Sequence, residues 1–188
     1  MRTFPTVLAA AIAFALSLSA AVSTTAAGDG ATASELKAAF LFNFAKFTEW
    51  PPDALRAGQP LELCVADDDA VAAALERIVK GRTIDGRALV TAAVSLKRDL
   101  TSCHVLYVGG LDGDASTLLR DTLKTAPMLT VADSDMFVKR GGIAQLIYEH
   151  DRMRFVINVA AARRAHLTLS SQLLNLATIV KGESDVDH

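Results

Sequence analysis

The chain has 188 residues, of which 51% are hydrophobic and 21% are charged, and its formal net charge is −2. This length is sufficient for one domain with a buried core. The near balance of charges excludes a basic nucleic-acid-binding protein, so no nucleic-acid partner is expected, and it excludes a highly charged disordered chain.

Residues 1–27 have the layout of a secretory signal peptide. Arg2 precedes an apolar run, and small residues follow, with plausible cleavage after Ala21, Ala26 or Ala27. The apolar run is too short for a spanning helix, and no later run reaches the roughly 18 residues that a membrane span needs. We therefore expect an exported protein that is not inserted in the membrane after cleavage. An uncleaved N-terminal anchor is the alternative.

An aromatic helix is predicted at the start of the mature chain. Ser34 is the predicted N-cap, and the helix covers residues 35–50, where a Pro-Pro pair stops it. Phe40, Phe44 and Phe47 form one stripe of this helix. Such a stripe usually packs against a sheet. The alternative is a groove or a homodimer face, because aromatic residues are enriched in interface cores.

The following segments alternate between apolar runs and helical patterns. Strands are predicted over residues 61–66, 88–96, 103–108 and 128–131, and helices over about 70–80 and 114–125. Two further runs, 143–149 and 153–159, are joined by a short turn and predict a C-terminal antiparallel hairpin. A helical tail to Lys181 follows, with a break near His166. This order favours a single compact α/β domain with a mostly parallel central sheet flanked by helices.

An acidic triplet, Asp67–Asp69, precedes the first of the two helices within this segment. A carboxylate at this position can cap the helix, which Gly81 then ends. The triplet lacks the alternating ligand pattern of a calcium loop. Helix capping is therefore the preferred interpretation.

Cys64 and Cys103 are the only cysteines. An even number of cysteines in an exported protein favours pairing. Two buried free thiols are one alternative. A metal site is another, although it would need His104, which as the neighbour of Cys103 points to the opposite face of a strand.

No pattern for catalysis or for cofactor binding stands out. The serines lack a GxSxG context, and Gly109-Gly110 lacks the GxGxxG order of a dinucleotide loop. Asp133 and Asp135 lie across a turn, where such a spacing is common in solvated loops. We expect no enzymatic activity, no cofactor and no metal.

Four patterns in a fixed order resemble the YfiR/HmsC-type family of bacterial periplasmic regulators. They are KAAFLFNFAKFTEWP at 37–51, CHVLY at 103–107, PMLTV at 127–131 followed by Phe137 and GGI at 141–143, and RFVINV at 154–159 leading to LSSQLLNLA at 169–177. The resemblance covers residues 34–181, and residues 182–188 are expected to be a disordered tail.

The resemblance implies a non-enzymatic periplasmic protein. The best-understood members of the family bind the periplasmic sensor domain of an inner-membrane diguanylate cyclase and repress it, which lowers cyclic-di-GMP output and biofilm formation, and many other members occur beside other membrane signalling proteins. Cys64 and Cys103 match the family's recurrent bridge, which implies disulfide-dependent folding. Val131 and Val138 stand in the region where some members have a second cysteine pair.

Three residues are predicted to contact the partner: Trp50 at the end of the aromatic helix, Phe137 in a polar turn, and Glu149 at a strand end. The alternative function is that of a periplasmic small-molecule binding protein that feeds a membrane sensor or transporter. Its crevice would lie at the strand ends that hold Asp67, Gly109 and Asp133.

Overall fold

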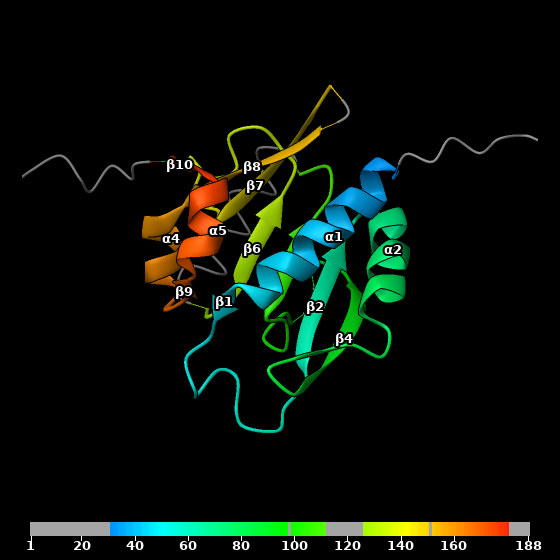
Figure 1. The fold of residues 1–188 in the computed structure, drawn as a ribbon, viewed down its shortest axis with the longest axis vertical. Coiled ribbons are helices and arrows are strands. Elements are labelled where there is room, and N and C mark those ends of the chain that lie inside the picture. The colour runs from blue at the N-terminus through cyan, green and yellow to red at the C-terminus, as the bar shows by residue number, and fades with distance from the viewer. Residues whose placement is uncertain (1–30, 98, 112–125, 151, 181–188) are drawn as a thin grey trace, which may run out of the picture. The chain divides into compact units, whose positions relative to one another are not determined.

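The computed structural model describes residues 31–97, 99–111, 126–150 and 152–180 (Figure 1). The predicted signal peptide (1–27), the predicted helix over 114–125 and the predicted tail (182–188) lie outside the described residues. Within the described ranges, no helix is both long enough and apolar enough to cross a membrane.

A mixed sheet of eight strands organises the described residues, in the order β10-β8-β7-β6-β5-β2-β4-β3. Its strands are β2 (Leu61–Ala66), β3 (Thr83–Ile84), β4 (Arg87–Val94), β5 (Val105–Val108), β6 (Leu129–Ala132), β7 (Ala144–Glu149), β8 (Arg152–Asn158) and β10 (Thr178–Val180). Neighbours pair in parallel except for the antiparallel pairs β3–β4 and β7–β8. The predicted fold class and the C-terminal hairpin are therefore confirmed.

The two faces of the sheet belong to two apolar clusters, because side chains alternate along each strand. Leu63, Val105 and Val131 face the larger cluster, which also contains residues of α1 (Ala33–Lys46) and α2 (Asp69–Val79). Cys64 and Leu106 face the smaller cluster. Figure 1 shows α1 and α2 side by side on one face of the sheet.

The aromatic stripe of α1 packs against the sheet, as its spacing predicted. Phe44 is buried, and its ring meets the ring of Phe155 on β8 edge to face at 5.1 Å between centroids. Phe40 meets the same ring at 5.6 Å. Edge-to-face contacts of this kind add about 0.5–1.5 kcal/mol to the burial of each pair.

Both predicted ends of the aromatic helix were wrong. Thr32, not Ser34, is the N-cap, because its side chain accepts the Glu35 N–H and the Glu35 carboxylate accepts the Thr32 N–H in return. The helix ends at Lys46 instead of running on to the Pro-Pro pair. The next residues form β1 (Thr48–Glu49), which pairs antiparallel with β9 (Thr168–Leu169).

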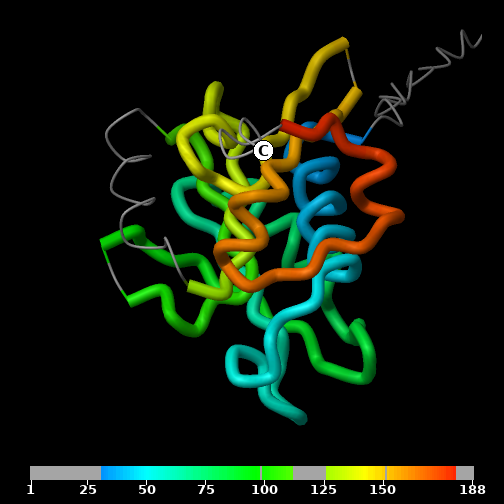
Figure 2. Tube along the Cα trace, turned by 90° about the vertical axis from the view of Figure 1, so that its left-hand side faces the viewer, coloured from blue at the N-terminus to red at the C-terminus, as the bar shows by residue number. Residues whose placement is uncertain are grey.

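The C-terminal tail is not one interrupted helix. It forms α4 (Val159–Arg164), β9, α5 (Ser171–Leu176) and the edge strand β10, which pairs in parallel with β8. The predicted break near His166 is present, and the continuation of the helix to Lys181 was wrong. Figure 2 shows this orange and red segment passing beside α1, which is blue.

Two strands of the sheet are paired along only part of one edge within the described residues. β6 pairs with β7 only at Ala144 and Gln145, so the β7–β8 hairpin extends beyond the end of β6. At the other edge, β3 covers only Arg87 and Ala88 of β4, and no strand in the described part of the chain pairs with the outer edge of residues 89–94.

Candidate functional site

Cys64 and Cys103 form a disulfide, which confirms the predicted pairing. Cys64 lies in β2, and Cys103 lies just before the neighbouring strand β5, so their Cα atoms are 5.8 Å apart. Both residues are buried in the smaller cluster. They are 39 residues apart in sequence, and on the chain-entropy view a bridge that closes such a loop contributes about 4 kcal/mol to stability.

Trp50 is held against the residue that follows Cys103. Its indole N–H donates to the His104 carbonyl at 3.2 Å, and its ring meets the His104 imidazole edge to face. The side chain is partly buried. Trp50 therefore packs the segment after β1 onto the start of β5, and only part of its ring is exposed.

Phe137 lies inside the molecule, with 3% of its surface exposed. Its ring fills the space beside Gly142, where an added Cβ would stand 2.2 Å from the nearest ring carbon. The Phe137 carbonyl also accepts the Gly142 N–H at 3.0 Å. This burial gives Phe137 a packing role, so the contact surface proposed below does not include it.

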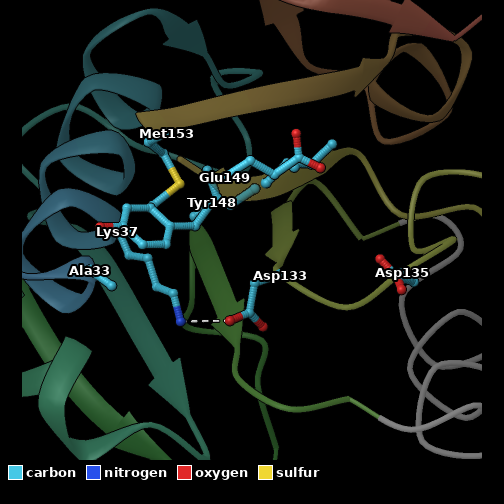
Figure 3. Close-up of a pocket in the computed structure, with 9 residues that line it drawn as sticks. Ala33, Lys37, Asp133, Asp135, Tyr148, Glu149 and Met153 are labelled. Carbon is cyan, nitrogen blue, oxygen red and sulfur yellow. Dashed lines mark hydrogen bonds and ion pairs between the residues drawn. The ribbon is translucent and has the colours of Figure 1, made fainter. Parts of the chain in front are cut away.

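Glu149 is exposed at the end of β7 and lines a recess beside the hairpin (Figure 3). We call this space, of about 330 Å³, the hairpin recess. It is lined by Ala33, Lys37, Asp133, Asp135, Leu146, Ile147, Tyr148, Glu149 and Met153. Of the three predicted contact residues, Glu149 is the one that the structure places at a hollow of the surface.

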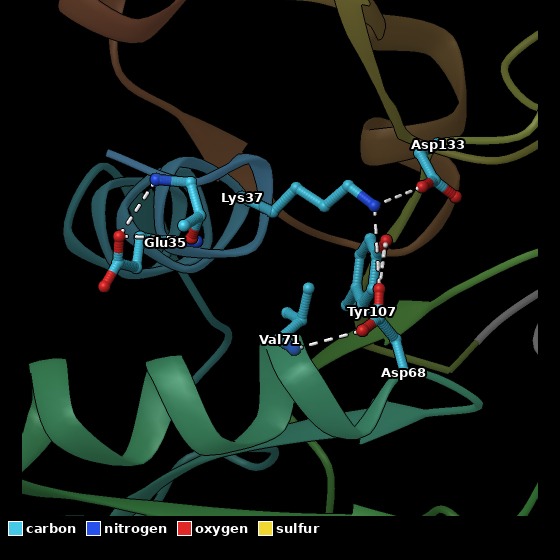
Figure 4. A network of polar contacts seen from close by, with 7 residues as sticks. Glu35, Lys37, Asp68, Val71, Tyr107 and Asp133 are labelled. Atoms are coloured by element: carbon cyan, nitrogen blue, oxygen red, sulfur yellow. Dashed lines mark hydrogen bonds and ion pairs between the residues drawn. The ribbon is translucent and has the colours of Figure 1, made fainter. Parts of the chain in front are cut away.

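A polar network borders the hairpin recess (Figure 4). The Nζ atom of Lys37, on α1, lies 2.6 Å from Oδ2 of Asp133 and 3.6 Å from Oδ2 of Asp68. The hydroxyl of Tyr107, on β5, donates to Oδ2 of Asp68 at 3.4 Å. Asp68 also caps α2, as the acidic triplet predicted, by accepting the Val71 N–H.

The charges of this network set the protonation states of its members. Burial opposes ionisation of Asp133, but the hydrogen bond and charge of Lys37 outweigh it, and the pKa of Asp133 is lowered. Burial and the neighbouring charges of Asp133 and Asp68 raise the pKa of Tyr107 far above its usual value. Tyr107 therefore stays protonated and acts as a hydrogen-bond donor.

The network spans the edge of the sheet where a ligand crevice was expected. The chain runs from β2 to β4 on one side and then returns to β5 on the other, and such reversals mark ligand sites at the carboxyl ends of parallel strands. Gly109 packs tightly there, since an added Cβ would stand 2.8 Å from the Cβ of Asp68. Lys37 bridges the carboxylates of Asp68 and Asp133 next to Gly109. The open space in this part of the molecule is the hairpin recess, beside the β7–β8 hairpin.

Two side chains, one in this network and one beside the disulfide, were not predicted from the sequence. Lys37 is one polar residue of a largely apolar helix, and its pairing with Asp133 joins residues 96 positions apart. Glu62 stands two positions before Cys64, and only the alternation of a strand places the two side chains on one face. The alternation of side chains along β2 could therefore have predicted that Glu62 lies beside the disulfide.

Together, the fold and the bridge define a disulfide-linked α/β domain with a charged edge beside a protruding hairpin. The sequence profile of the YfiR/HmsC-like family matches residues 34–178, and the chain belongs to this family.

Among solved structures, the chain is similar to one described as a conserved domain protein from Vibrio cholerae O1 biovar El Tor, with 18% sequence identity and a TM-score of 0.48. The match covers 81% of this chain and 61% of that chain, so this chain spans less than two thirds of that protein's length. None of the curated proteins matches this chain.

Proposed function

We propose that this protein is a non-enzymatic periplasmic regulator that binds the periplasmic sensor domain of an inner-membrane diguanylate cyclase and represses it. Membership of the YfiR/HmsC-like family carries this proposal. Repression lowers cyclic-di-GMP output and biofilm formation. The exported form begins after a cleaved signal peptide, and residues 34–181 make up the regulatory domain.

The mechanism is a shift of population. A regulator that binds the inactive sensor more tightly than the active one shifts the equilibrium by that difference in affinity. The folded fraction of the regulator sets how much of it is available to bind. Because the Cys64–Cys103 bridge stabilises the fold, reduction of the bridge lowers the folded fraction of the regulator and so weakens repression.

The exposed residues of the hairpin recess support this recess as the place where the partner binds. Glu149 is exposed there, next to the exposed ring of Tyr148, while Asp133 on the opposite wall is already paired with Lys37. We propose that the partner docks at the hairpin end through Glu149, and that the exposed part of Trp50, at the opposite end of β5, makes a separate contact.

Co-purification from solubilised membranes under oxidising conditions tests the proposal. Wild-type protein is expected to retain a membrane protein with a GGDEF domain, and Glu149→Arg is expected to retain much less of it. Glu76→Arg is the matched control, because Glu76 is an exposed glutamate on α2, away from the recess. Retention of no cyclase by the wild type, together with unchanged cyclic-di-GMP in a deletion strain, would contradict the proposed function.

A periplasmic small-molecule binding protein is the second candidate, and the hairpin recess favours it. A space of about 330 Å³ lies at the lower end of the range for small-ligand pockets. A thermal-shift screen of small polar molecules tests this function. A compound that raises the melting temperature of the wild type but not of Asp135→Leu would favour it over regulation by protein contact.

A further inference from the structure

The disulfide has a carboxylate beside it. Glu62 and Cys64 are two positions apart on β2, so their side chains lie on the same face of the strand. Ligand atoms of Glu62, Cys64 and Cys103 all lie within 4.8 Å of one another. Glu62 Oε1 is 4.0 Å from Cys64 Sγ, and it accepts a hydrogen bond from the Ser102 hydroxyl.

His104 is not part of this cluster. Its Nδ1 atom accepts the Glu62 backbone N–H at 3.1 Å, and its carbonyl accepts the indole N–H of Trp50. The third potential ligand beside the two sulfur atoms is therefore the Glu62 carboxylate and not the His104 imidazole, although His104 is the neighbour of Cys103 in the sequence.

The ligand capacity of the cluster depends on its redox state. A dithiol reductant supplies two electrons and two protons, which break the S–S bond and leave two thiols, while the reductant becomes a disulfide. Thiols lose their protons on binding a metal, and thiolates are preferred ligands of zinc and other soft cations. A closed disulfide offers no thiolate.

We propose that reduction of the Cys64–Cys103 bridge creates a binding site for a zinc-class divalent cation, with the two thiolates and the Glu62 carboxylate as ligands. Sulfur and carboxylate ligand atoms around tetrahedral zinc lie about 3.5–3.8 Å apart, as follows from bond lengths of about 2.3 Å to sulfur and 2.0–2.2 Å to oxygen. The present distance of 4.0 Å between Cys64 Sγ and Glu62 Oε1 is close to this value, and the two sulfur atoms separate to about 3.8 Å once the bond between them is broken.

The surroundings allow a cation to enter. The two cysteines are buried, but Glu62 is partly exposed and Ser102 is exposed, so water reaches the cluster from this side and supplies the fourth ligand. The bound cation links β2 to the residues before β5, as the bridge did. It also occupies both thiolates and so slows re-formation of the disulfide.

Cobalt, used as a spectroscopic substitute for zinc, tests this inference. The purified protein is reduced with a dithiol, the reductant is removed without oxygen, and Co²⁺ is added while circular dichroism reports the fold. The reduced wild type is expected to bind one Co²⁺ with a thiolate-to-cobalt charge-transfer absorption. Zinc is expected to displace the cobalt, and the oxidised protein is expected to show no such absorption.

Two variants separate this site from adventitious thiol binding. Glu62→Gln is expected to weaken cobalt binding about tenfold or more. Glu76→Gln, on the distant helix α2, is expected to leave it unchanged. Equal affinity of both variants, absence of the absorption, or loss of the fold on reduction would each overturn the inference. None of these outcomes depends on the partner proposed above.

Discussion

His104 connects the start of β5 to β2 and to the segment after β1 through three different groups. Its imidazole accepts the Glu62 N–H, its carbonyl accepts from Trp50, and its N–H donates to the Glu62 carbonyl at 2.9 Å. Burial lowers the pKa of His104, and weaker opposing contributions come from the Ala54 backbone and from the Glu62 charge. The neutral imidazole is the form that can accept the Glu62 N–H.

The lowered pKa of His104 predicts a loss of stability between about pH 7.5 and pH 5. As the pH falls, the unfolded chain takes up the proton first, near the usual histidine pKa of about 6.5, and this favours unfolding. Urea unfolding across this range tests the prediction in wild type and in His104→Gln, whose slope is expected to be shallower. His166→Asn, at an exposed residue with φ of 56°, is the control. The same slope in His104→Gln as in wild type would contradict the prediction.

Gly142 shows how one missing side chain shapes the fold. Replacing it with alanine places a Cβ within 2.2–2.5 Å of three ring carbons of Phe137, and this buried ring has little room to move. We expect Gly142→Ala to cost about 1–3 kcal/mol of unfolding free energy, measured by chemical denaturation. In a Phe137→Leu background the same substitution should cost clearly less. An equal cost in both backgrounds would show that the ring is not the cause.

At the scale of elements, the helix and strand boundaries that depend on neighbouring residues were predicted most accurately. Strand β2 has the predicted bounds, Asp68 caps α2 as expected, and Gly81 with φ of 70° follows the end of this helix. These features depend on neighbouring residues only. β1 could not be predicted in this way, because Thr48 and Glu49 become a strand only by pairing with residues 168 and 169.

The same limit applies to the candidate site. The disulfide could be predicted from the cysteine count and the resemblance, and the exposure of Glu149 from its place at a strand end. The pairing of Lys37 with Asp133 and the burial of Phe137 depend on how distant segments meet. β10 was missed because its three residues continue a helical pattern, and only the open edge of β8 makes them a strand.

The start of α1 provides a prediction at this scale. Thr32→Ala removes the half of the capping box in which the Thr32 hydroxyl accepts the Glu35 N–H, and it is expected to cost about 1 kcal/mol. Ser34→Ala, two residues later and inside the helix, is expected to change stability much less. Thermal unfolding of the two variants measures the difference. A larger cost for Ser34→Ala would restore the assignment of the cap to Ser34.

At the scale of the whole molecule, two links join elements that lie far apart in the sequence. The Cys64–Cys103 bridge ties β2 to the start of β5, and the Lys37 network ties α1 to the loops after β2 and β6. The bridge is covalent and persists in the unfolded chain, whereas the network exists only in the fold. They therefore stabilise the protein by different means.

Removal of the bridge should lower stability without changing the fold. Cys64→Ser/Cys103→Ser is expected to lose up to about 4 kcal/mol of unfolding free energy, which is a large part of the total for a single domain. Urea unfolding, with far-ultraviolet circular dichroism of the native state, tests this. Lys37→Met provides a comparison, because it removes the other link but leaves the bridge. A double-serine variant as stable as wild type would contradict the disulfide-dependent folding proposed here.

The outer side of β4 leaves six consecutive residues, 89–94, without a strand partner in the described part of the chain. The stretch LVTAAV has no charge, proline or glycine, the devices by which natural proteins usually guard such an edge. Arg87 and Lys97 are the nearest cations on either side. Replacing these two cations with neutral residues is therefore expected to promote pairing of this edge between copies of the protein, and so aggregation, in concentrated solution.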